Sequence, residues 1–431
     1  MAIERLRALE DEMKTCFRCS LCKMVPLPVI TDSRYAQGCP ANREYHVHGY
    51  SGSGKSIMAL SLLEDRITAD ETLAEIAFAC TTCGLCDVAC KFIMDSERQV
   101  VNIALREHMV DKGLGLPAHR KVIEQQKRVS HREASYLPHL KWARELGLKV
   151  LPEEKADVLL LPGWTRHGVD ESIETAGKLA RMLLRAGFDV GILGTARQDT
   201  GLFAYWTGYR DLFTDTALEL SLLINGLDVR TVVTVSGADL GILRAKYPEY
   251  GIELKPEVLH ATEVLARLIK KRKLRLPRTV RAKVTYHDPC YLGRQSEPPH
   301  QWEGELRMTH GVMTYFSPPK PINRGVNGVF DPPRDILESI RGIDFVEMHR
   351  IREYALCCGG GGGVPEAYPR LAGNTALHRI DEARSSGAQY LVTACHHCRN
   401  NLTDAQAAAP DARLPVVDII DLVYEATDIE V

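Results

Sequence analysis

Thirteen cysteines, gathered into tight groups, constrain the fold of this 431-residue chain more than any other feature. The N-terminus has an amphipathic helix pattern without the apolar core of a signal peptide, so we predict a cytoplasmic protein, in which disulfides are rare. The odd number of cysteines also argues against a complete disulfide framework, whereas their short spacings are typical of metal ligands. We therefore expect the cysteines to bind metal.

Two runs near the N-terminus each place three cysteines at positions i, i+3 and i+6 and a fourth further along. Such a run is typical of bacterial ferredoxins, in which three cysteines bind one [4Fe-4S] cubane and the fourth binds the other cubane. The pattern predicts two crossed ligand sets. Set 1 comprises Cys16, Cys19, Cys22 and Cys90, and set 2 comprises Cys39, Cys80, Cys83 and Cys86.

Two details depart from the ferredoxin pattern. Lys91 follows the last cysteine, where proline is usual, and the route from Cys22 to Cys39 is long and irregular. Zinc is the alternative metal, because CxxC pairs also bind zinc. Three cysteines in one CxxCxxC row nevertheless favour iron–sulfur clusters.

Between the two runs, residues 49–56 match the phosphate-loop pattern GxxxxGK[ST]. A phosphate loop needs a buried strand before it, but residues 42–48 are polar. An α/β nucleotide-binding domain also does not fit between two ferredoxin runs. We predict a glycine turn that caps a helix between the clusters, with ATP binding as the alternative.

From Ala156 onward, short apolar runs alternate with helical patterns, which predicts parallel strands covered by helices. The expected strands are 157–161, 189–193 and 230–235, and then 283–286, 344–348 and 389–394. The return of the same layout predicts an internal repeat. The expected domains are a helical dicluster ferredoxin-like domain at 1–110, a helical connector at 111–155, a cysteine-free α/β repeat at 156–280, and a cysteine-bearing α/β repeat at 281–431 with an insert at about 297–333.

The remaining five cysteines follow strands of the second repeat, and five glycines at 359–363 come directly after the pair Cys357–Cys358. An ordered glycine costs more conformational entropy than any other residue. We therefore expect this backbone to pass close to a bound group, and a flexible linker is the alternative.

The first repeat contains no cysteine. When 233–239 is aligned with 392–398, Ser236 and Asp239 stand at the positions of Cys395 and Cys398. We interpret the first repeat as a copy that lost its cluster. Asp199 and Asp239 as oxygen ligands of another ion are the alternative.

The order Cx…CCGx…CxxC, with matching stretches at 287–294 and 392–398, resembles the cysteine-rich CCG domain. The whole chain resembles the D-type subunit of heterodisulfide reductase and its relatives, including the D-type electron-transfer subunit of class II benzoyl-CoA reductase complexes. The resemblance implies a multidomain fold, with an α-helical two-[4Fe-4S] ferredoxin-like module followed by a pseudo-duplicated α/β CCG domain pair. It also implies a noncubane [4Fe-4S] cluster. Its implied ligands, set 3, are Cys290, Cys357, Cys358, Cys395 and Cys398.

Several neighbours of set 3 are candidate site residues. The backbones of Gly359, Gly360 and Gly361 are expected to offer N–H groups to the cluster, which would raise its reduction potential. The candidates for proton delivery or carboxylate binding are His287, Arg294, His396 and His397. The alternative is that His396 and His397 only donate hydrogen bonds to sulfur.

The predicted function is that of an iron–sulfur electron-transfer subunit of a multisubunit cytosolic anaerobic oxidoreductase, relaying electrons between the two cubanes and the noncubane cluster. The chain has no flavin or nucleotide fingerprint, so the expected partners are flavoprotein or ferredoxin-like subunits. One alternative is a heterodisulfide or thiol–disulfide reductase that acts at the noncubane cluster. A structural zinc protein is another.

Composition excludes two partner classes and leaves the insert open. A net charge of −2 gives no polyanion-binding surface, so no nucleic acid is expected. No apolar run approaches the ~18 residues of a membrane span, so no direct membrane span is expected. The insert at about 297–333 is a surface loop, a lid or a docking surface.

Overall fold

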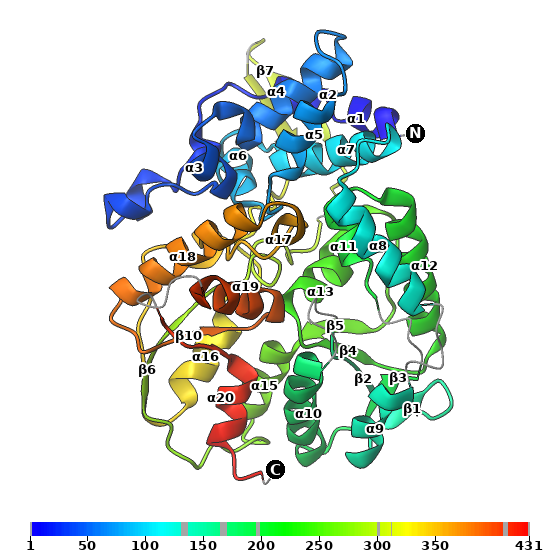
Figure 1. The fold of residues 1–431 in the computed structure, drawn as a ribbon, viewed down its shortest axis with the longest axis vertical. Helices are drawn as coiled ribbons and strands as arrows, with labels where there is room; N and C mark the ends of the chain where they lie inside the picture. The colour runs from blue at the N-terminus through cyan, green and yellow to red at the C-terminus, as the bar shows by residue number, and fades with distance from the viewer. Residues whose placement is uncertain are drawn as a thin grey trace.

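The computed structural model describes residues 2–130, 137–163, 170–194, 199–299, 302–311, 313–407 and 413–429. A helical N-terminal module lies across one end of two α/β units, over the junction between them (Figure 1). No helix within the described ranges is long and apolar enough to cross a membrane.

The N-terminal module is helical throughout, apart from 3₁₀ turns and loops. Its helices are α1 (Ala2–Ala8), α2 (Glu10–Lys14), α3 (Pro40–Tyr45), α4 (Gly52–Leu63), α5 (Glu71–Phe78), α6 (Leu85–Met94) and α7 (Arg98–Asp111). The side chains of Ser51 and Asp70 cap α4 and α5 by accepting backbone N–H groups. Helix α7 is almost entirely buried, although it carries Arg98 and Arg106. Charged residues at such positions need polar partners inside the fold.

Helices α8 (Pro117–Ser130) and α9 (Leu137–Glu145) connect the module to the first parallel sheet. Its strands are β1 (Lys149–Leu151), β2 (Val158–Leu161), β3 (Val190–Leu193), β4 (Thr231–Thr234) and β5 (Glu257–His260), in the order β1-β3-β2-β4-β5. Its helices are α10 (Asp170–Arg185), α11 (Leu202–Thr207), α12 (Arg210–Gly226), α13 (Gly237–Gly241), α14 (Tyr247–Glu249) and α15 (Ala261–Lys270). Strand β1 falls inside the range expected for the connector, yet it pairs with β3.

The second parallel sheet has the order β11-β10-β6-β9. Its strands are β6 (Ala282–Tyr286), β9 (Ile343–Phe345), β10 (Tyr390–Thr393) and β11 (Val416–Asp418). Its helices are α16 (Asp331–Ser339), α17 (Val364–Ala367), α18 (Pro369–Ser385), α19 (His396–Ala407) and α20 (Ile419–Ala426). The insert contains an antiparallel hairpin of β7 (Glu305–Thr309) and β8 (Met313–Ser317).

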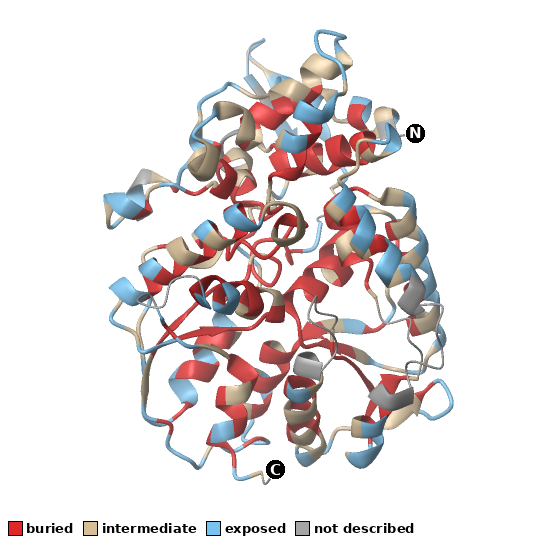
Figure 2. Ribbon diagram, in the orientation of Figure 1, coloured by how far each residue is buried: buried red, intermediate tan, exposed pale blue. Residues whose placement is uncertain are grey.

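Four strands of each sheet follow one another in the same spatial order, since β3-β2-β4-β5 corresponds to β9-β6-β10-β11. The two sheets share a core, which includes Leu160 of β2, Val284 of β6 and Ile420 of α20. Buried residues are accordingly continuous across the junction of the two units (Figure 2). The parallel strands covered by helices that the sequence predicts are confirmed.

His260 makes the stability of the first unit sensitive to acid. Its Nδ1 accepts a hydrogen bond from the Thr262 amide and its Nε2–H donates to the Val235 carbonyl oxygen. Burial lowers the pKa of His260 to about 3, so the folded state resists a proton that the unfolded chain accepts below its ordinary value of 6.5. Stability is therefore lost as pH falls from 6.5 toward 3.

At pH 5.5 we expect His260 to cost about 1.4 kcal/mol of unfolding free energy relative to pH 7.5. Urea unfolding of the wild type and of His260→Gln at both pH values measures this term. The variant should lose less stability on acidification by about that amount. An equal loss in both proteins would contradict the assignment.

Candidate metal centres

The two CxxCxxC runs have the same backbone conformation. In the first run, Arg18 and Ser20 have φ values of 59° and 70°, and the matching positions of the second run, Thr82 and Gly84, have 49° and 70°. Three of these four residues are not glycine, and positive φ is uncommon for such residues. The shared conformation is therefore a property of the CxxCxxC motif. It lets the three thiols of a run reach one bound group.

Set 1 brings Cys90, on α6, to the first run. Burial and the charge of Asp87 raise the pKa of Cys90 to about 12, and the thiols of Cys22 and Cys16 lie near enough to add to this shift. The set reaches the protein surface, because Cys19 is exposed whereas Cys22 is buried.

The four thiols of set 2 line one cavity, together with Gly52, Lys55 and Arg98. Burial raises the pKa of Cys39 to about 12, and the Lys55 ammonium opposes that rise. A Cβ atom at Gly52 would lie 2.9 Å from the Cβ of Cys86. Helix α4 thus begins with glycine because it starts directly against set 2.

Residues 49–56, the phosphate-loop match, separate the two sets. Ser53 Oγ lies 3.3 Å from the Cys22 thiol of set 1, while Gly52 touches set 2. The buried Lys55 Nζ donates to the Tyr50 carbonyl oxygen at 2.5 Å. Among the described residues the strands begin only at Lys149, so the strand that a phosphate loop requires is absent. As predicted, a glycine-containing turn begins a capped helix here.

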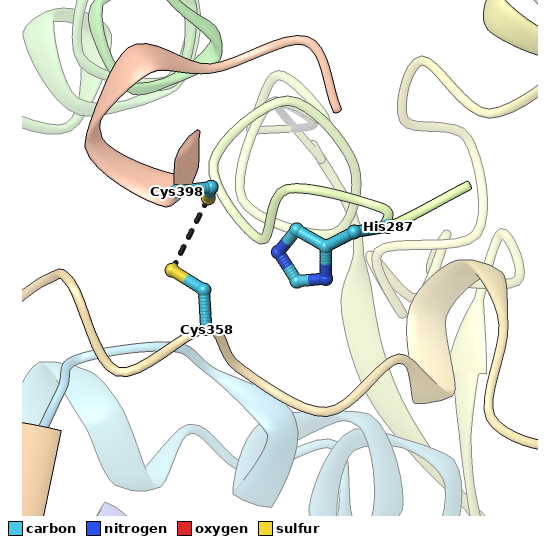
Figure 3. A group of neighbouring side chains, drawn as sticks. All are labelled: His287, Cys358 and Cys398. Carbon is cyan, nitrogen blue, oxygen red and sulfur yellow. Dashed lines mark hydrogen bonds between the residues drawn. The ribbon is translucent and has the colours of Figure 1, made fainter. Parts of the chain in front are cut away.

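Set 3 assembles where β6 and β10, which are neighbours, end at one edge of the second sheet. Its thiols form a continuous series of neighbours, in which Cys357 lies between Cys290 and Cys358, and Cys398 lies between Cys358 and Cys395. The Cys358 and Cys398 sulfur atoms are 3.2 Å apart (Figure 3). The structure therefore gathers the five residues into one series, and four of the five are buried.

The glycine run brings set 3 against set 2. The amides of Gly359 and Gly360 donate to the sulfur atoms of Cys357 and Cys358, each at 3.3 Å. A Cβ atom at Gly361 would lie 2.9 Å from the Thr81 carbonyl oxygen, and one at Gly362 2.3 Å from that of Cys80. Only glycine allows this close packing.

The Cys83 thiol of set 2 lies beside the Cys357 thiol of set 3. Sets 2 and 3 therefore adjoin through side chains as well as through the backbone.

Buried cations around the thiols test whether an anionic group fits. Arg98 Nε and Nη1 and Arg294 Nη2 are buried without a hydrogen-bond partner, and Lys55 is also buried. Burying a cation without an anionic partner is costly. Iron–sulfur clusters held by thiolates are anions with sulfur acceptors, so the residues present fit such clusters.

His287 approaches set 3 with a fixed protonation state. Its Nδ1 accepts a 3.1 Å hydrogen bond from Arg379 Nε, which can only donate. Burial and the Arg379 charge lower the pKa of His287 to about 3, so the ring is neutral and its proton resides on Nε2. That nitrogen faces the sulfur atoms of Cys358 and Cys398 (Figure 3), and the three atoms lie within 4.8 Å of one another. His287 is therefore a hydrogen-bond donor toward set 3.

The structure brings the other sequence candidates to set 3 as well. His396 is buried at the start of α19, and His397 stacks edge-on against Trp206 with ring centroids 5.3 Å apart. Arg294 donates to the Cys83 carbonyl oxygen at 2.6 Å and so lies between sets 2 and 3.

Known proteins resemble this chain in both cysteine-rich regions. Residues 12–92 match the family model of a 4Fe-4S dicluster domain, and residues 313–403 match that of a cysteine-rich CCG domain. The D-type subunit of dihydromethanophenazine:CoB–CoM heterodisulfide reductase from Methanosarcina mazei is 31% identical over 371 residues, which cover 84% of this chain and 80% of that one. The same protein from Methanosarcina acetivorans is 28% identical and covers 97% and 95% of the two chains. The chain belongs to the family of heterodisulfide reductase D-type subunits.

More distant relatives of this heterodisulfide reductase family member include the EtfAB:quinone oxidoreductase of Syntrophomonas wolfei, 25% identical. The match covers 85% of this chain but 48% of that protein. The predicted resemblance to the D-type subunit of heterodisulfide reductase is thus confirmed. The resemblance to class II benzoyl-CoA reductase subunits stays a prediction. The two matched domains make this family member an iron–sulfur protein.

Sequence reasoning missed the polar residues that support the sets in this heterodisulfide reductase family member. Arg98, Asn102 and Arg106 lie four residues apart on one face of α7, and all three are buried. Polar side chains at helical spacing within an apolar helix were the available signal. Arg379 and Glu382, which form a buried ion pair behind His287, offered no such signal.

Proposed function

We propose that this chain is an iron–sulfur electron-transfer subunit of a multisubunit oxidoreductase, relaying electrons between two cubanes and one noncubane [4Fe-4S] cluster. One observation carries the proposal: the three cysteine sets form a continuous series from the surface to the interior. Cys19 of set 1 is exposed, residues 52–53 touch both set 1 and set 2, and the Cys83 thiol of set 2 lies beside the Cys357 thiol of set 3.

In this proposal, sets 1 and 2 each hold a cubane and set 3 holds the noncubane cluster. Bound clusters of these kinds accept and release single electrons at potentials set by charge, hydrogen bonds and solvent exposure. The protein supplies the thiols, the glycine amides and the buried cations. His287 supplies a further donor from Nε2.

We also propose that the two α/β units are copies of one ancestral CCG domain. The shared strand order supports this, as does the contact of equivalent positions, since Ser236 Oγ lies 3.7 Å from the Cys395 sulfur. Only the second copy carries the thiols. A chain with one such centre suits a relay better than a mechanism that needs a cluster in each copy.

We propose a flavoprotein or ferredoxin-like partner in an anaerobic cytoplasm, because the sequence has no flavin fingerprint and the phosphate-loop match at 49–56 follows no strand among the described residues. The relatives' names support this, because an EtfAB:quinone oxidoreductase is among them. The hairpin β7–β8 exposes Met308, Met313 and Tyr315, which suits a docking surface. A lid over set 3 is less suited, because Lys320, just after β8, pairs with Asp95 of the helical module.

A thiol–disulfide reductase is the second candidate, favoured by one cavity. This cavity lies beside set 3 and is lined by residues of both units, including Gly360, His397 and Asp239. Burial raises the pKa of Asp239 to about 7, so its carboxyl group can hold a proton at neutral pH. A small disulfide substrate in this cavity would meet a proton source next to set 3 for the thiolate that its reduction releases.

Disulfide turnover by the isolated chain separates the two functions. Under argon, the purified chain is mixed with reduced viologen and an excess of a low-molecular-weight disulfide, and viologen oxidation is followed by absorbance. We expect three clusters to become reduced once, without sustained turnover. Continuous viologen oxidation with stoichiometric thiol release would instead establish the reductase, and loss of that turnover in Asp239→Asn would assign it to the cavity.

A further inference from the structure

Arg294 is a buried cation in the seam between sets 2 and 3. Its residue is 6% exposed, and it follows Cys290 in the turns after β6. The guanidinium spans three segments, since Nε donates to the Cys83 carbonyl oxygen at 2.6 Å and Nη1 donates to the carbonyl oxygens of Glu353 and Ala355 at 2.9 Å each. One side chain therefore ties the loop of set 2 to the segment that leads into Cys357.

The guanidinium has no carboxylate partner among the described residues. Within the described ranges the hydrogen bonds of the guanidinium go to backbone carbonyl oxygens, and Nη2 is buried without a hydrogen-bond acceptor. The groups that raise the pKa of Arg294 against its burial are the thiols of Cys83, Cys290 and Cys357. A buried arginine is normally matched by a carboxylate. Here, sulfur ligands from both sets occupy that place.

From this geometry we propose that Arg294 is a positioning residue shared by two clusters. It fixes the spacing of the centres held by sets 2 and 3, and its charge raises the reduction potentials of both. A fixed positive charge stabilises the reduced, more negative state of each neighbouring cluster, and burial preserves that effect from screening by salt. The inference rests on the proposed function, because it requires clusters at both sets.

The shared charge has a functional consequence. A cation on one cluster alone would pull electrons toward that cluster. A cation between two clusters raises the reduction potentials of both clusters together. The difference between the two potentials therefore stays small, and electrons can pass between the clusters in either direction. Arg294 thus favours electron retention by this pair over set 1, which lies at the surface.

Redox titration of Arg294→Gln under argon tests the inference, with each cluster followed by electron paramagnetic resonance. We expect the midpoint potentials of the clusters at sets 2 and 3 to fall together, that of set 1 to stay, and the magnetic coupling between the reduced clusters of sets 2 and 3 to weaken. The matched control is Arg352→Gln, which removes the same charge from a surface pair with Asp331. The control should leave all potentials unchanged.

Unchanged potentials in a fully loaded Arg294→Gln protein would overturn the inference, as would a shift confined to one of the two clusters. Both results leave the proposed function intact, whose own failure appears as missing iron or disulfide turnover in the wild type. If Arg294→Gln loses iron, Arg294→Lys decides, because it keeps the charge. Potentials near those of the wild type then support the inference, and lowered potentials contradict it.

Discussion

Replacing Cys358 by serine is expected to remove about four of ~12 bound irons while the two cubanes remain. Cys358 stands in the middle of set 3, next to Cys357 and with its sulfur atom 3.2 Å from that of Cys398. Sets 1 and 2 do not use it, so their spectra should persist. Iron determination and electron paramagnetic resonance of the anaerobically purified variant measure the effect.

The matched control for Cys358→Ser is Ser236→Ala. Ser236 touches set 3 through Cys395 but is not a proposed ligand, so this variant should keep close to the wild-type iron content. Full iron content in Cys358→Ser would show that this thiol is not a ligand. Loss of all iron from a variant that keeps its helical circular dichroism would show that the three sets are not independent sites.

Replacing Arg106 by methionine is expected to lower the free energy of unfolding by about 4 kcal/mol. We expect this loss to be the largest for any single substitution of a buried residue other than cysteine. The buried guanidinium donates to the carbonyl oxygens of Ala77, Phe78 and Cys80 in the helical module, and to those of Trp206 and Gly362 in the α/β units. Methionine removes all five hydrogen bonds at the place where the three parts of the chain meet. Thermal unfolding and the iron content of the purified variant report the loss.

Two further variants serve as comparisons for Arg106→Met. Arg106→Lys keeps the charge but offers at most three donors, so we expect an intermediate loss. Arg120→Met removes an exposed arginine of α8 and should change stability by no more than about 0.5 kcal/mol. A wild-type unfolding temperature in Arg106→Met would contradict the view that this side chain joins the three parts.

The ligand sets stay predictions that rest on the local spacing of the cysteines. Each CxxCxxC run specifies its own loop. Five of the six predicted strands lie inside the sheets and are largely buried, whereas β9 lies at a sheet edge. Strands β1, β5 and β11 escaped prediction, because each is only three or four residues long, lies at a sheet edge and is partly exposed. Such strands lack the continuous apolar run of a buried strand.

Contacts between parts distant in sequence were beyond sequence reasoning. Nothing in the sequence places Cys83 against Cys357, or Arg294 against the carbonyl of Cys83, because these depend on how the helical module docks on the α/β units. The glycine run did predict a close approach of its backbone. Besides the thiols of its own set, this backbone approaches the loop of set 2 through Gly361 and Gly362.

Mössbauer spectroscopy of the ⁵⁷Fe-enriched, anaerobically purified chain, with iron and zinc determined in the same sample, tests the central claim most directly. We expect ~12 irons per chain. Two-thirds of the signal should come from two cubanes and one-third from a cluster with a different spectrum. About eight irons with cubane spectra alone would remove the cluster at set 3, and zinc in place of iron would contradict the account as a whole.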